Sequence, residues 1–204
     1  MVPIDSIVQA WEQKRLYSIV CDHDTIEGSK RTCQRIRERS PETPEVLAEE
    51  ITTADGELIG LFLNEEVPPG LGAEETVDIV HAQGGLVLVP HPFCRYRSRA
   101  IRREVLVRLL DRLDIIEGYN ARNVTDEDNY PAIEFAESNG LPISVGSDAH
   151  IPMEIAKVWM EVPLFETPQD LLARMKGARV CFRRSSNAVH IFTKMVKMMR
   201  KHVT

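Results

Sequence analysis

Leu16-Tyr17-Ser18-Ile19-Val20-Cys21 leads directly into Asp22-His23-Asp24-Thr25, so a run of strand-forming residues ends in two carboxylates and an imidazole. The same kind of junction recurs where a second apolar run, residues 142–145, is followed by Gly146-Ser147-Asp148-Ala149-His150. In sheets of parallel strands, ligands sit beyond the carboxyl ends of the strands. The two junctions therefore predict one site at one edge of a sheet.

The rest of the chain alternates predicted strands with predicted helices. Helices are expected at residues 4–14, 29–39, 73–82, 99–112 and 129–138, after Thr167-Pro168-Gln169-Asp170, and at 188–202. Strands are expected at 16–21, 46–53, 57–63, 86–89, 114–117, 142–145, 157–162 and 180–182, with Asp55-Gly56 as a hairpin turn. This order predicts an α/β fold with a mainly parallel sheet and right-handed crossovers.

Composition limits the classes of protein to be considered. The 204 residues are expected to form a single domain, 1–204. The net charge of -6 argues against a stable complex with nucleic acid, and no apolar run is long enough to span a membrane. The amino end has no signal-peptide pattern, and the four cysteines lack Cys-x-x-Cys spacing. We therefore expect a cytoplasmic protein without disulfides.

Polar side chains follow four of the predicted strands. They are His23, His91 in Val89-Pro90-His91-Pro92-Phe93, Asn120, and Asp148 with His150. Neutral imidazole and ionised carboxylate are ligands that suit zinc, manganese or iron. Asp22 and Asp24 flank His23 and are expected to orient imidazoles in a second shell rather than to bind metal.

Five motifs, taken in order, carry a family resemblance. They are 21–28 (Cys-Asp-His-Asp-Thr-Ile-Glu-Gly), Glu50-Ile51-Thr52, His91-Pro92-Phe93, 116–122 (Ile-Glu-Gly-Tyr-Asn-Ala-Arg) and Gly146-Ser147-Asp148-Ala149-His150. Together they resemble the polymerase and histidinol phosphatase (PHP) domain family of metal-dependent phosphoesterases. The family pattern T-D-H-D-T-x-x-G has threonine where this chain has Cys21. The resemblance covers about residues 4–165 and is specific because the order is kept.

The resemblance implies a distorted (β/α)7 TIM-like barrel that holds two or three divalent ions. The ligands carried over are His23, Glu50, His91, Asp148 and His150, with His91 and Asp148 also expected to serve catalysis. Glu49, beside Glu50, is the alternative ligand at that position. A metal-bound hydroxide would attack phosphorus, while metals and nearby cations would hold the phosphoryl oxygens.

One part of the family pattern is missing. The family opens with a strand carrying His-x-His, and no His-x-His occurs in this sequence. Residues 1–8 resemble what normally follows that strand, so we expect the chain to be a fragment that lacks its first strand. A barrel without that strand would expose a sheet edge, through which the chain could self-associate.

The predicted function is hydrolysis of a phosphate ester, either a small phosphorylated metabolite or a nucleotide. Arg95, Arg97, Asn120 and Arg122 are the candidate phosphate contacts, since guanidinium groups bind phosphate in bidentate fashion. A solvated basic surface is the alternative for the arginines. A catalytically incomplete binding or regulatory module, and a metal hydrolase acting on a non-phosphate bond, are the competing functions.

Overall fold

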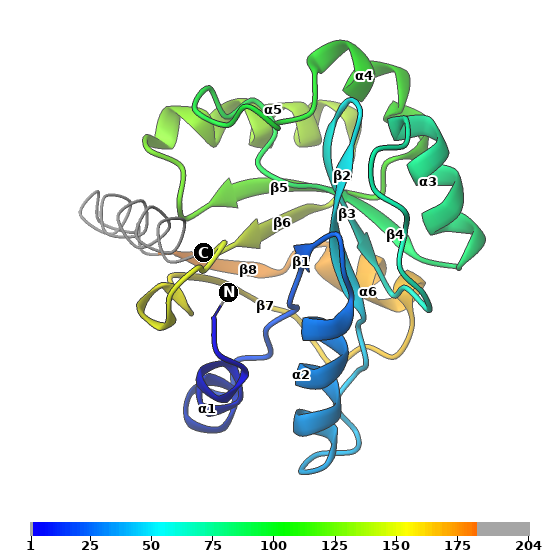
Figure 1. The fold of residues 1–204 in the computed structure, drawn as a ribbon. Helices are drawn as coiled ribbons and strands as arrows, with labels where there is room; N and C mark the ends of the chain where they lie inside the picture. Colours follow the sequence, from blue (N-terminus) through cyan, green and yellow to red (C-terminus); the bar gives the residue numbers. More distant parts are fainter. Residues whose placement is uncertain (1, 183–204) are drawn as a thin grey trace, which may run out of the picture.

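A six-stranded sheet forms the centre of the computed structural model, which describes residues 2–182 (Figure 1). Its strands pair in chain order: β1 (Asp22–His23), β2 (Ala48–Thr53), β3 (Gly56–Leu61), β4 (Leu86–Val89), β5 (Ile115–Asn120) and β6 (Ile143–Gly146). The β2–β3 hairpin makes β3 antiparallel to both of its neighbours, and the other pairings are parallel. β1, β2, β4, β5 and β6 therefore all run in one direction.

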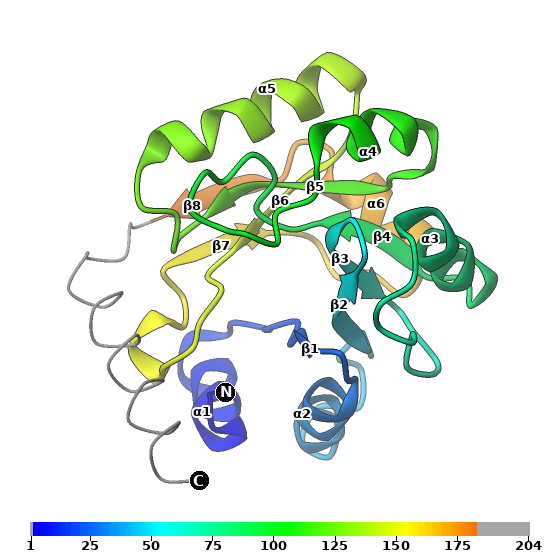
Figure 2. The ribbon, with the colours of Figure 1, turned by 45° about the horizontal axis from the view of Figure 1, so that its top comes forward.

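The sheet curls into a half-barrel with helices on its outer side (Figure 2). These helices are α2 (Glu27–Arg37), α3 (Ala73–Ala82), α4 (Arg103–Arg108) and α5 (Tyr130–Asn139), while α1 (Ile4–Lys14) lies beside α2. A separate antiparallel pair, β7 (Val158–Glu161) with β8 (Arg179–Phe182), flanks α6 (Pro168–Met175) in the chain. Short 3-10 turns complete the order at Leu110–Arg112, Asp126–Asp128 and Pro152–Glu154.

Both faces of the sheet are covered by apolar side chains. On one face Ile51 and Ile116 pack with Val77 of α3 and Leu106 of α4, and on the other Ile115 packs with Leu171 of α6. All four residues of β4 are buried, as expected for a strand covered on both sides. The two apolar layers form the core on either side of the sheet.

Two local signals in the sequence are confirmed. The Thr167 hydroxyl accepts a hydrogen bond from the Asp170 N–H at 3.1 Å, so α6 begins with the predicted cap and with Pro168 in its first turn. The β2–β3 turn requires Gly56, because its φ is 135° and a Cβ there would lie 2.4 Å from the Cα of Ile101.

Several predicted elements need correction. Residues 16–21 form no strand, and the first strand is the two-residue β1, which pairs with Glu49 and Glu50 of β2. Strand propensity there is not matched by a strand partner among the described residues. Residues 99–102 are not helical, because Arg99 O accepts from Glu57 N and the segment bonds to the β2–β3 hairpin instead.

The α/β class is confirmed, and the mainly parallel sheet is interrupted by β3. The described residues form an open half-barrel, so closure into a (β/α)7 barrel stays a prediction. The predicted helix 188–202 lies outside the described residues. Within those residues, no helix has the length and apolar character needed to cross a bilayer.

Candidate metal centre

The predicted site residues gather at the edge where the parallel strands end. His23 ends β1, His91 follows β4 by two residues, and Asp148 follows β6 by two residues. Glu50 lies within β2 beside His23, since the register pairs these two residues directly. The topology therefore brings four segments that are far apart in sequence to one edge.

Two glutamates lie between two imidazoles at this edge. Glu50 approaches His23 Nδ1 with Oε2 at 3.5 Å and His91 Nε2 with Oε1 at 3.2 Å. Glu57, the second residue of β3, approaches the same nitrogens with Oε1 at 3.8 Å and Oε2 at 3.6 Å. Each carboxylate thus presents one oxygen to each imidazole. We call these four residues the paired-glutamate half of the site.

The spacing of these atoms fits metal coordination. Two ligand atoms that each lie about 2.1 Å from one ion are at most about 4.2 Å apart. The four nitrogen–oxygen distances, 3.2 to 3.8 Å, are all shorter than that limit. Ligand atoms of His23, Glu50 and Glu57 also lie within 4.8 Å of one another. The spacing of the ligand atoms in the paired-glutamate half is therefore compatible with binding of a divalent ion.

Charge in this half also indicates a place for a cation. Burial, and then the neighbouring Glu50 carboxylate, raise the pKa of Glu57 despite the opposing effect of His91 and His23. His91 Nδ1 is buried and has no hydrogen-bond partner among the described residues. A bound divalent ion would offset the repulsion between the two carboxylates.

Strand register distinguishes Glu50 from Glu49. Successive side chains of a strand point to opposite faces, so only one of the two can face His91. Glu49 is 0% exposed and accepts a hydrogen bond from Val67 N at 3.0 Å, on the face away from the imidazoles. Glu50 is therefore the one that the structure brings to the candidate centre.

The other half of the site centres on Asp148. Its carboxylate accepts a hydrogen bond from the Arg97 guanidinium and lies 3.4 Å from His150 Nδ1. Burial acts to raise the pKa of Asp148, but the charges of Arg97, His150 and His91 outweigh burial and lower it. His150 Nδ1 donates to the Asp148 carbonyl at 2.9 Å, which places the ring proton on Nδ1. We call Arg97, Asn120, Asp148 and His150 the Asp148 half.

A buried carboxylate, Glu117, joins the two halves. Glu117 Oε2 accepts from His91 N at 2.6 Å and from Asn120 Nδ2 at 3.0 Å, and Asn120 Nδ2 also lies 3.4 Å from Asp148 Oδ2. Burial raises the pKa of Glu117. A Cβ on Gly146 would lie 1.8 Å from Glu117 Oε1, so the glycine of Gly-Ser-Asp-x-His makes room for this carboxylate.

The backbone is left-handed at three predicted site residues. Asp24, His91 and Asp148 have φ values of 55°, 33° and 45°. Non-glycine residues adopt such angles rarely, and they persist where surrounding contacts hold them. Asp148 and His150 both lie in the segment after β6, and the left-handed backbone at Asp148 bends that segment.

The remaining arginines contact acidic side chains of the protein. Arg122 Nη1 donates to both carboxylate oxygens of buried Glu154 at 2.8 and 2.9 Å, and Glu154 Oε2 accepts from His150 N at 2.7 Å. Arg95 donates to Asp128 at 2.8 Å. The proposed contacts of Arg95 and Arg122 with phosphate stay predictions.

Asp22 and Asp24 contact the backbone around β1. Asp24 Oδ1 accepts from Thr52 N at 2.7 Å, which ties the end of β1 to β2. A Cβ on Gly28 would lie 1.9 Å from Asp22 Oδ2, so the glycine of the first motif accommodates that carboxylate. Their predicted role in orienting imidazoles is not tested by these contacts.

The structure adds residues that the sequence reading did not select. Glu57 lies in the strand predicted at 57–63, and its place next to the Asp55-Gly56 turn puts it diagonally opposite Glu50 across the hairpin. Glu117 interrupts an apolar strand, a pattern that signals a buried charge. Glu154 is 0% exposed, and no motif marked it.

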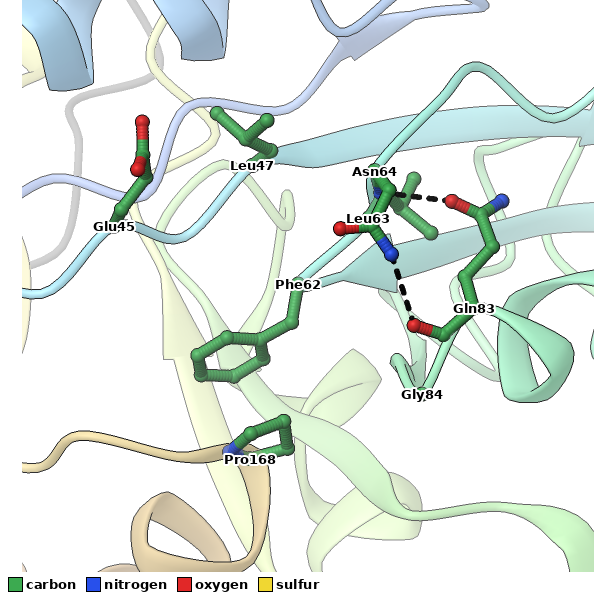
Figure 3. A pocket seen from close by; sticks show the side chains of 8 residues that line it. All are labelled: Glu45, Leu47, Phe62, Leu63, Asn64, Gln83, Gly84 and Pro168. Carbon is green, nitrogen blue, oxygen red and sulfur yellow. Dashed lines mark hydrogen bonds between the residues drawn. The ribbon is translucent and has the colours of Figure 1, made fainter.

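A cavity of about 360 Å³ lies at the other end of the sheet (Figure 3). Its walls include Leu47, which precedes β2, Phe62 and Asn64, which follow β3, and Pro168. Asn64 N donates to Gln83 Oε1 across one side at 2.8 Å. None of the predicted site residues lines this cavity, so it is separate from the candidate centre.

Comparison with known proteins gives consistent results. A family model described as PHP-associated matches residues 126–180, which include Asp148 and His150. Two uncharacterized proteins of Methanocaldococcus jannaschii are similar in sequence. MJ0417 is 32% identical over 164 residues, covering 78% of this chain and 64% of that protein. MJ1587 is 36% identical over 107 residues, covering 52% of this chain and 61% of that protein. The chain thus spans less than two thirds of either relative.

Solved structures share the fold at low sequence identity. One is a two-domain protein of Bacteroides vulgatus that contains a predicted PHP-like metal-dependent phosphoesterase, with a TM-score of 0.62 and 16% identity over 90% of this chain and 63% of that one. Another is PsfC of Pseudomonas syringae, with a TM-score of 0.59 and 17% identity over 100% of this chain and 92% of that one.

Proposed function

We propose that this chain, which a PHP-associated family model matches over residues 126–180, is a PHP-type divalent-metal-dependent hydrolase of phosphate esters. His23, Glu50 and His91 would hold metal in one half of the site, and Asp148 and His150 in the other. Glu57 joins this set because it faces both imidazoles of the first half. Zinc, manganese and iron all suit such nitrogen and oxygen ligands.

The observation that carries this proposal is the position of Glu50 and Glu57 between His23 and His91. Two carboxylates held this close without a neutralising ion repel one another, and burial strengthens the repulsion. When bound, divalent ions supply a nucleophile at neutral pH and stabilise charge on a phosphoryl group. The protein's part is to hold the ligands in place, which strand pairing and the Glu117 network do.

The proposed substrate is a small phosphorylated metabolite or a nucleotide. The acidic chain can bind such an anion because bound cations reverse the local charge. Arg97 and Asn120 lie at Asp148 and are the best placed of the predicted phosphate contacts. We further propose that the half-barrel has the (β/α)7 architecture of PHP domains. The four unpaired cysteines suit the cytoplasmic location that we also propose.

The experiment that tests the proposal is a metal-dependent hydrolysis assay. The metal-free protein is mixed with Mn²⁺ or Zn²⁺ and with p-nitrophenyl phosphate or a panel of nucleotides. Phosphate release that requires metal, and that falls at least about a hundredfold in Glu50→Gln, supports the proposal. Binding of metal without turnover would favour a binding module. Turnover of lactones or amides that phosphate does not inhibit would favour a non-phosphate hydrolase.

A further inference from the structure

Arg97 forms a largely buried ion pair with Asp148. Within the described residues, no arginine or lysine forms an equally buried ion pair in the paired-glutamate half. The Arg97 guanidinium donates to Asp148 Oδ2, while His150 lies beside Oδ1. The Arg97 and Asp148 side chains are only 25% and 17% exposed. Both oxygens of the Asp148 carboxylate thus face positive or proton-donating groups of the protein itself.

Among residues 2–182, the paired-glutamate half has no equivalent buried cation. Arg99 approaches Glu57 Oε1 at 3.6 Å, but its side chain is 59% exposed and also donates to Thr52 Oγ1 at 3.2 Å. An exposed ion pair at that distance contributes little because water screens it. An ion that enters this half therefore meets carboxylates that no buried guanidinium has neutralised.

The loop that carries Arg97 is held at a neighbouring residue. Arg95, two residues earlier, donates through Nε to Asp128, which is 1% exposed. Because Arg95 fixes the loop independently, the Arg97 side chain can leave Asp148 by rotating its own bonds. Departure would leave two charges to be balanced, those of Asp148 and of Arg97.

We propose that Arg97 is a tethered counter-ion of Asp148, which a divalent ion must displace before it can bind in the Asp148 half. This inference rests on the proposed function. The displaced guanidinium stays within a side chain's length of the site and gains a new anion when a phosphate ester binds. Arg97 therefore makes binding of the ion at Asp148 weaker than binding in the paired-glutamate half, and links it to binding of the phosphoryl group.

Calorimetric titration of the metal-free protein with Mn²⁺, in buffer without phosphate, tests the inference. The wild type is expected to show two classes of Mn²⁺ site, a tighter one in the paired-glutamate half and a weaker one in the Asp148 half. Asp148→Asn is expected to abolish the weaker class. In Arg97→Gln the weaker class tightens by about tenfold or more, because Asp148 loses its competing cation. The tighter class should change by less than about twofold, since Arg97 is not among its ligands.

Two further variants keep the result interpretable. Arg108→Gln removes an arginine that pairs with Glu74 on the protein surface and not with Asp148, so the weaker class should keep its wild-type affinity. Arg97→Lys retains the charge without the planar fork and should give an affinity between those of wild type and Arg97→Gln. If Arg97→Gln does not fold, Arg97→Lys decides, and tighter binding than wild type is required.

Equal or weaker binding of the second ion in the folded Arg97 variants would overturn the inference while leaving the proposed function intact. Absence of any bound ion in wild type and in all variants would overturn the proposed function itself.

A second experiment repeats the Mn²⁺ titration in the presence of inorganic phosphate. Phosphate should tighten Mn²⁺ binding in the weaker class more in wild type than in Arg97→Gln.

Discussion

The paired-glutamate half and the Asp148 half both combine carboxylate with imidazole but balance their charge in opposite ways. In the first, two carboxylates face two imidazoles, and the pKa of Glu57 is raised by burial and by Glu50. In the second, burial acts to raise the pKa of Asp148, but Arg97, His150 and His91 together outweigh burial and lower it. The first half is therefore arranged for an added cation, whereas the second already contains one. The two halves are therefore expected to differ in metal affinity, because the residues around the proposed ligands decide the charge.

The largest effect is expected from breaking the link between the halves with Gly146→Ala. A Cβ at this position would lie 1.8 Å from Glu117 Oε1 and 3.0 Å from Glu117 Cδ, and Glu117 is buried. We expect the free energy of unfolding to fall by about 3 kcal/mol, with His91 N losing its hydrogen bond to Glu117. Urea denaturation of the metal-free protein measures the change.

Gly72→Ala is the matched control for this substitution. Gly72 precedes α3, and the nearest side-chain atom to an added Cβ is 4.0 Å away. The expected loss is below about 1 kcal/mol, since only the helix cap changes. Equal losses for the two variants would show that Glu117 is not held against Gly146.

The second effect is on metal affinity in the paired-glutamate half. Glu57→Gln keeps the shape of the side chain but removes one of the two facing charges. Affinity for the first Mn²⁺ or Zn²⁺ ion should fall on the order of a hundredfold, because a carboxylate ligand is replaced by a weaker amide oxygen. Calorimetry of metal-free protein gives the constant. Unchanged affinity would remove Glu57 from the set of ligands.

The third prediction concerns pH, where the halves should have opposite signs. The pKa of Glu57 is higher in the folded protein than in the unfolded one, so ionised Glu57 destabilises the fold. The stabilising contribution of protonated Glu57 to the free energy of unfolding is complete below about pH 4.3 and is lost as pH rises through the folded pKa. Glu57→Gln should therefore stabilise the metal-free protein increasingly as pH rises above that point.

Asp148 should behave in the reverse way. Its pKa is lowered, so its contribution is present above about pH 3.9 and is lost as pH falls through the folded value. Asp148→Asn should destabilise the protein near neutral pH and become neutral in acid. Unfolding measured between pH 3 and pH 8 compares the two profiles, and parallel profiles would contradict the difference in charge balance.

The sequence alone predicted the elements whose signals are local. Residues 73–82 and 86–89 are the helix and strand that it indicated, because apolar periodicity and Gly84-Gly85 mark their limits. It also predicted which segments meet at the site, since strand ends share an edge. The short β1 could not be predicted, because pairing with β2, not propensity, decides where a strand forms.

The sequence could not reveal contacts made across the fold. Glu57 reaches His91 only because β3 turns back beside β2, and Arg97 meets Asp148 across 51 positions of the chain. The choice between Glu49 and Glu50 stayed open for the same reason, as both carboxylates occur in one strand. Register against β1 and β3 decides which of them faces the imidazoles.

The smallest effect is expected from Glu49→Gln, which tests that choice. Glu49 is buried on the far face of β2, where Oε2 accepts from Val67 N and Oε1 has no hydrogen-bond partner among the described residues. Glutamine retains an acceptor for Val67 N, and burial raises the pKa of Glu49, so losing the charge costs little. Affinity for the first Mn²⁺ ion should change by less than about twofold, whereas Glu50→Gln should lower it on the order of a hundredfold. A large loss in Glu49→Gln with no loss in Glu50→Gln would mean that β2 presents its other face to the metal, and the register of the whole hairpin would then be wrong.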